Sequence, residues 1–113
     1  MSFEEGVQAK VALLAQGFRT RLPARLAALD EAFALCRSEP AAPHQWDELH
    51  RLLHSLGGAA GTFGLAPLGL AARAIEAQIA ERQAAGPAWS ADQIDAIGLG
   101  LEGLRAWLPA PTE

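Results

Sequence analysis

His54 stands in the middle of a helical apolar repeat, and glycines follow it closely along the chain. The apolar side chains fall within a stripe about 120° wide at about 100° per residue; they are Trp46, Leu49, Leu52, Leu53, Leu56, Ala60 and Phe63. On the same helical wheel His54 lies about 140° from the centre of the stripe, so we expect its imidazole to face water. An exposed histidine is in large part neutral near pH 7, and a free ring nitrogen is a nucleophile toward phosphorus. His54 is therefore a candidate nucleophile.

Three glycines share the flank of the helix on which His54 lies. Gly57, Gly58 and Gly61 follow it by three, four and seven residues. Each glycine inside a helix costs about 1 kcal/mol relative to alanine. Close packing of two helices within the protein would explain such residues, but Gly58 and Gly61 point away from the apolar stripe. We therefore favour close approach by another molecule, whose backbone could reach the histidine over a surface almost free of side chains.

Two further side chains of the same helix could contribute to the chemistry. Arg51, one turn before His54, is the basic residue of this helix best placed beside it, although its ordinary interpretation is a solvated surface arginine. His50 precedes His54 by four residues, which is a spacing that can bind a metal ion. Asp47 is near, but no acidic residue, cysteine or further histidine is obviously placed to complete a metal site. We find no glycine-rich phosphate loop and no carboxylate cluster for Mg²⁺, so we expect no metal and no cofactor, and a partner must bring the catalytic machinery.

The pattern of the whole chain predicts an all-α fold, an antiparallel four-helix bundle with an additional N-terminal helix, as a single domain over residues 1–113. Capping boxes at Ser2 and Ser90 mark two helix starts, and Gly64 is a plausible C-terminal cap. Pro23 is tolerated in the first turn of a helix. The expected helices span about 3–18, 21–37, 44–62, 67–85 and 91–108, with loops at 38–43 and 86–89.

Composition excludes several classes of function. The chain has 113 residues and a net charge of −4, which argues against binding to nucleic acid or to an anionic membrane surface. No stretch approaches 18 consecutive apolar residues, and no signal peptide is visible, so we expect neither a membrane span nor export. The single cysteine, Cys36, excludes an internal disulfide and suits a reducing cytoplasm. It falls on an apolar helix face, where we expect a small buried hydrophobe.

The segment around His54 resembles the signature of histidine phosphotransfer (HPt) domains of bacterial phosphorelays. That signature is a histidine, a small hydrophobic step, a Lys-Gly pair, two small residues, and a glycine after an apolar residue. Here it reads His54, Leu56, Gly57-Gly58, Ala59-Ala60 and Phe63-Gly64, followed by Leu68, Ala72 and Ile75-Glu76 on the next helix. Phe18, Pro23, Leu26 and Leu29 match the preceding helix, so the resemblance covers most of the chain. One position departs from the signature, because the usual lysine is Gly57.

The resemblance implies a phosphocarrier rather than an enzyme, with His54 as the phosphoacceptor. Its partner would be a receiver domain of a response regulator or hybrid histidine kinase, which supplies an aspartate and Mg²⁺. The resemblance also implies a monomer. The surface expected to face the phosphate and the partner comprises His50, Arg51, Gly57, Gly58 and Gly61.

Two alternatives remain open at the level of sequence. One is a degenerate HPt-like interaction module that binds a receiver or a helical partner without phosphate. The other is a small helical metal-binding protein that uses His50 and His54.

Overall fold

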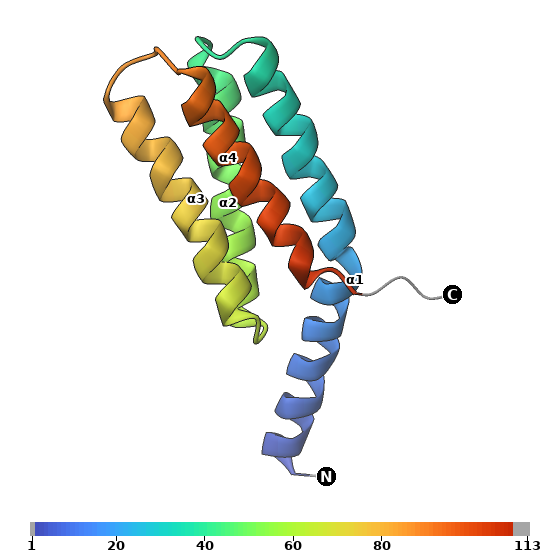
Figure 1. Cartoon of the computed structure of the whole chain (residues 1–113). Coiled ribbons are helices and arrows are strands. Elements are labelled where there is room, and N and C mark those ends of the chain that lie inside the picture. Colours follow the sequence, from blue (N-terminus) through green and yellow to red (C-terminus); the bar gives the residue numbers. More distant parts are fainter. Residues whose placement is uncertain (1, 110–113) are drawn as a thin grey trace.

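Residues 2–109, which the computed structural model describes, form four α-helices and one short 3-10 helix. These are α1 (Phe3–Ser38), α2 (Pro43–Thr62), α3 (Ala66–Ala84), α4 (Ala91–Gly103) and η1 (Leu104–Trp107). The helices run alternately up and down the bundle, and the first part of α1 extends beyond the other three (Figure 1). This arrangement confirms the expected all-α four-helix bundle. The outermost residues of the expected domain, Met1 and 110–113, lie outside the described residues.

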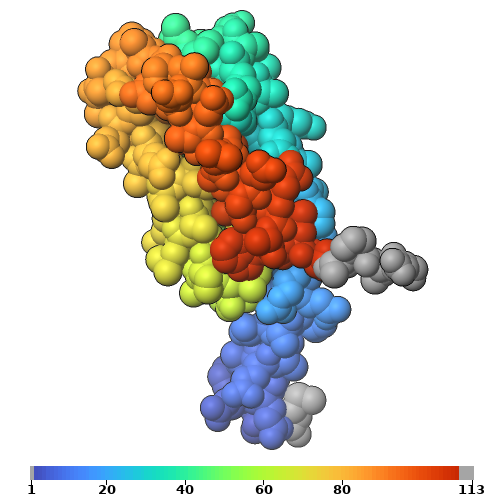
Figure 2. All heavy atoms as spheres, viewed as in Figure 1, coloured from blue at the N-terminus to red at the C-terminus, as the bar shows by residue number. Residues whose placement is uncertain are grey.

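The two helices expected over 3–18 and 21–37 are one continuous helix, which corrects the predicted break between them. Pro23 lies inside α1, where proline removes one backbone hydrogen bond. The reason for the continuity lies in the buried side chains, which recur every three or four residues on both sides of the proline: Phe18, Leu22, Leu26, Leu29 and Phe33. An unbroken helix keeps this whole stripe on the core. The additional N-terminal helix is therefore the projecting first half of α1 (Figure 2), where Val7, Val11 and Leu14 are 44% to 51% exposed.

Local sequence signals place most of the helix ends. Both capping boxes are formed, Ser2 with Glu5 and Ser90 with Gln93. Gly64 has a φ of 85°, a conformation that favours glycine, and it follows α2 as predicted. In the part of the chain that the structure describes, none of the helices combines the length and the apolar content needed to cross a bilayer.

Trp46 holds the start of α2 in place. Its ring is 1% exposed and stacks on Trp89 with the ring centroids 3.6 Å apart. It also meets Phe33 of α1 edge-on, and its Nε1 donates a hydrogen bond of 2.9 Å to the carbonyl oxygen of Pro40. These contacts tie α2 to α1 and to the loops at one end of the bundle, so the helix that carries His54 is anchored at its N-terminal end.

Two glycines let α2 and α3 pack unusually closely near the end of α2 and the start of α3. A Cβ atom added to Gly69 of α3 would lie 2.9 Å from the carbonyl oxygen of Gly57 on α2. Real Cβ atoms do not approach backbone oxygen that closely, so any other residue at position 69 would push the helices apart. This contact sets the distance between α2 and α3 beside His54.

The thiol of Cys36 is buried in the core, as the sequence predicts, and is 0% exposed. Burial raises the pKa of this thiol to about 12, so the neutral form persists well above neutral pH. We expect the folded protein to react with iodoacetamide at pH 8 at least about 100-fold more slowly than the unfolded protein. Mass spectrometry of samples with and without guanidinium chloride measures both rates. Equal rates would show that this part of the core opens freely.

Candidate functional site

The imidazole of His54 projects from the middle of α2 into solvent. Its side chain is 77% exposed, while the opposite face of the helix buries Leu49, Leu53 and Leu56. The orientation matches the helical wheel, because the apolar stripe of α2 has only one way to face the core.

Glu76 of α3 orients the ring of His54. Its Oε1 atom lies 2.7 Å from Nδ1 of His54, and the glutamate side chain is only 16% exposed. An ionised carboxylate accepts hydrogen bonds and does not donate them, so in this contact Nδ1 carries the ring proton. The other ring nitrogen, Nε2, then holds the free lone pair. Glu76 thus sets both the direction of the ring and the nitrogen that can act as a nucleophile.

His50 approaches the same carboxylate from one turn earlier on α2. Its Nε2 atom lies 3.5 Å from Oε1 of Glu76, and its side chain is 34% exposed. Asp47, the other residue considered for a metal site, instead accepts a hydrogen bond of 2.9 Å from Gln83. Across residues 2–109 no three His, Cys, Asp or Glu side chains are grouped so that they could hold a metal ion. The described residues therefore offer no observation in favour of the metal-binding alternative.

The three glycines after His54 serve two different purposes. A Cβ atom added to Gly58 or Gly61 would meet no heavy atom within 4 Å, so the helix surface is open at both positions. Gly57 is buried, and a Cβ atom there would lie 3.0 Å from Cγ of Arg73 and 3.4 Å from the carbonyl oxygen of Gly69. The expectation that Gly57 faces a partner is therefore wrong. It serves the close packing of α3 on α2, because α3 crosses that flank of the helix.

The expected basic residue, Arg51, is paired within its own helix. Its Nε and Nη2 atoms donate hydrogen bonds of 2.9 and 2.6 Å to the carboxylate of Glu48. This pairing lowers the pKa of Glu48. Arg51 and Glu48 thus form an exposed ion pair on α2.

Sequence reasoning missed two residues of α3 that lie beside His54. Arg73 and Glu76 line one hollow of about 320 Å³ together with His50, His54, Ala77 and Ala80. The resemblance to HPt domains includes Glu76 without assigning it a role, and the sequence pattern does not single out Arg73. The pair Gly57 and Gly69 is the sequence signal that could have indicated a close approach of α3 to this part of α2.

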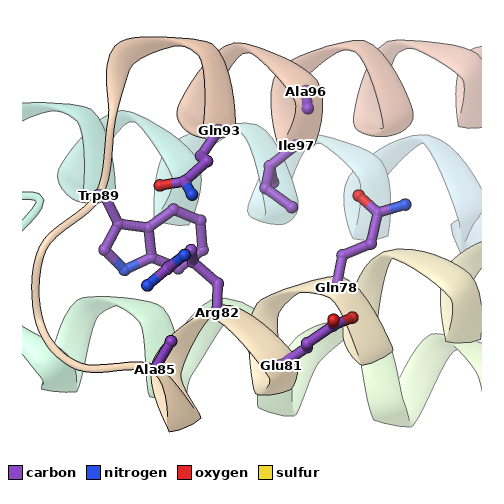
Figure 3. A pocket seen from close by; sticks show the side chains of 8 residues that line it. All are labelled: Gln78, Glu81, Arg82, Ala85, Trp89, Gln93, Ala96 and Ile97. Carbon is purple, nitrogen blue, oxygen red and sulfur yellow. The ribbon is translucent and has the colours of Figure 1, made fainter.

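A second hollow of about 290 Å³ lies between α3 and α4, and Figure 3 shows its lining. The labelled side chains come from α3, from α4 and from the loop that carries Trp89. The two hollows are similar in size, so the residues that line them, and not their volumes, indicate which one is the candidate functional site. Only the hollow on the α2–α3 face contains a histidine, and a nucleophile is what group transfer requires.

Most of the chain matches a known protein family. The model of the Hpt domain family matches residues 13–107, which include His54 and every residue placed around it. Neither the comparison with curated proteins nor the comparison with solved structures gives a match.

Proposed function

The chain belongs to the Hpt domain family, whose role is histidine phosphotransfer in phosphorelays, and we propose that His54 is its phosphoacceptor. The protein would accept a phosphoryl group from the aspartate of one receiver domain and donate it to the aspartate of another. The observation that carries this proposal is the exposed imidazole of His54, with Nδ1 held by Glu76 at 2.7 Å. The proposal includes a monomeric carrier in the cytoplasm.

The transfer step uses the nitrogen that Glu76 leaves free. The lone pair of Nε2 attacks the phosphorus of the receiver's aspartyl phosphate, a P–N bond forms, and the P–O bond to the aspartate breaks. The aspartate leaves as a carboxylate. The imidazole ring gains positive charge, and the carboxylate of Glu76 beside Nδ1 stabilises that charge. In the return step an aspartate of the next receiver attacks the same phosphorus and the P–N bond breaks.

The remaining requirements fall on the partner. Phosphoryl transfer depends on in-line positioning and on compensation of negative charge, in which a metal ion commonly takes part. The receiver would bring its aspartate and Mg²⁺, and its loops must approach the helix closely. The open positions at Gly58 and Gly61 support this approach, because no side chain stands between the helix surface and an incoming backbone.

The direct test mixes the purified protein with each receiver domain of its source genome, labelled with phosphate on aspartate. We expect at least one receiver to pass its label to this chain, in an acid-labile and base-stable bond typical of phosphohistidine. Binding to a receiver without transfer of label would instead support the degenerate interaction module. Failure of every receiver either to transfer label or to bind would contradict both functions.

Removing the carboxylate of Glu76 tests whether it orients the ring of His54. We expect Glu76→Ala to slow transfer about tenfold, because the ring loses a charge-assisted hydrogen bond that selects its direction and tautomer. Glu76→Gln should retain more activity, since the amide oxygen still accepts a hydrogen bond from Nδ1. Gln78→Ala is the matched control, as an exposed position on the same helix. Initial rates at saturating phosphorylated receiver measure the effect, and equal rates for Glu76→Ala and Gln78→Ala would remove Glu76 from the site.

A further inference from the structure

An arginine from α3 covers the position of α2 where the Hpt signature has its lysine. Gly57 lies three residues after His54 and has no side chain, and the stem of Arg73 lies over it. We propose that Arg73 supplies the positive charge that faces a phosphoryl group on His54. This inference rests on the proposed function and names a further residue of the same site.

The geometry places Arg73 on the correct flank of α2. A Cβ atom built on Gly57 would lie 3.0 Å from Cγ and 3.5 Å from Nε of Arg73, so the start of the guanidinium reaches this position. Residues three apart on a helix are surface neighbours, so position 57 and His54 share one flank. Arg73 and His54 also line the same hollow. The stem and Nε of Arg73 therefore lie on the flank of α2 that carries His54, and both side chains line one hollow.

The charges of the site create a need for such a cation. A phosphoryl group brings between about one and two negative charges near pH 7. It would be added next to the carboxylate of Glu76, which already holds His54. Like charges repel, so a positive group near the phosphoryl group, in addition to the charge on the ring, would stabilise the phosphorylated state.

Arg73 is the arginine available for that purpose. Within residues 2–109 its guanidinium makes no hydrogen bond or ion pair, whereas Arg51 makes two hydrogen bonds to Glu48. A guanidinium also presents paired N–H donors that match two phosphoryl oxygens. Arg73 can therefore engage the phosphoryl group without breaking an existing contact.

Gly57 and Arg73 are complementary. A side chain at position 57 would press against the stem of Arg73, so the glycine leaves the space that the arginine uses. A variant that places the positive charge on α2 instead of α3 tests this complementarity. Gly57→Lys in an Arg73→Ala background returns a cation to α2 at a position from which the obstructing stem has been removed.

The first arm of the experiment needs no partner. The purified protein is phosphorylated on histidine with phosphoramidate, which releases ammonia, and the phosphoryl group is titrated by ³¹P NMR. We expect the midpoint of this titration to rise by about half a pH unit in Arg73→Ala, because loss of a nearby cation disfavours the dianion. Arg73→Lys should fall in between, and the Gly57→Lys, Arg73→Ala double variant should return toward the original midpoint. Arg37→Ala, which removes an arginine paired with Asp95 of α4, should not move it. An unchanged midpoint in Arg73→Ala would overturn the inference.

The second arm measures transfer from a phosphorylated receiver with the same variants. We expect Arg73→Ala to be about 10- to 30-fold slower and the double variant to recover most of the rate. Arg37→Ala should stay within about twofold of the original rate, since Arg37 pairs with Asp95 of α4 and lies outside the site. If Arg73 had only a structural role, Arg73→Ala would lower the melting temperature, and a lysine at position 57 would not restore the transfer rate. If no receiver transfers label to the original protein while the first arm shows the shift, the proposed function fails and the contact of Arg73 with the phosphoryl group stands.

Discussion

Replacing His54 with glutamine is expected to abolish phosphoryl acceptance and leave the bundle folded. The lone pair of an amide nitrogen is delocalised into its carbonyl group, so glutamine offers no nucleophile in place of the ring nitrogen. We expect a loss of at least about 1000-fold in the rate of labelling by a phosphorylated receiver. The side chain of His54 is 77% exposed, and exposed substitutions usually change the free energy of unfolding by less than about 0.5 kcal/mol.

His50→Gln is the matched control for this prediction. His50 lies one turn away and contacts the same carboxylate, but at 3.5 Å rather than 2.7 Å. We expect it to retain labelling, and peptide mapping under alkaline conditions should find the phosphate on His54 alone. Label on His50, or undiminished labelling of His54→Gln, would mean that the nucleophile has been assigned to the wrong residue.

Gly58→Gln is expected to block transfer and to stabilise the protein at the same time. No heavy atom lies within 4 Å of a Cβ atom at this position, so the fold accepts a larger side chain. Glutamine has the higher helix propensity, and the change should raise the free energy of unfolding by roughly 0.5–1 kcal/mol. The same side chain would stand one turn from His54 in the path of the receiver's loops. We expect transfer to slow at least about 100-fold, because in-line geometry tolerates little displacement.

Gly6→Gln separates the two effects of this substitution. Gly6 also lies in a helix with open space around its Cβ position, in the projecting first half of α1. The control should show a similar gain in melting temperature and no loss of transfer. A normal transfer rate for Gly58→Gln would show that the open surface beside His54 is not where the receiver approaches.

Much of the fold follows from interactions between residues close in the chain. Capping boxes at Ser2 and Ser90 and the left-handed conformation of Gly64 are local features, and all three are present. The exposure of His54 also follows from a single helix, since the apolar stripe of α2 leaves its opposite face to solvent. For this reason the resemblance to HPt domains and the choice of the nucleophile could be made before any coordinates.

The break expected between residues 18 and 21 shows where local reasoning fails. Proline in a helix interior costs about 3 kcal/mol or more, which favours starting a new helix near Pro23. Burial of one large apolar side chain contributes about 1.5–3 kcal/mol. Phe18 and Leu22 are each 1% exposed, and a continuous helix buries both together with the stripe that follows. The free energy gained by burying these side chains therefore outweighs the local cost of proline inside the helix.

The sequence by itself determined the helical fold and the exposure of His54, the proposed nucleophile, because each depends on spacing within one helix. Only the tertiary structure decided what surrounds that nucleophile. Glu76 and Arg73 belong to α3, and the side of α3 that faces His54 depends on the rotation and separation of two helices. The contact between Gly57 and Gly69 sets that separation, and it transfers Gly57 from the expected partner surface to the packing of the bundle. Contacts between helices depend on the whole core at once, so no periodicity within α2 could reveal them.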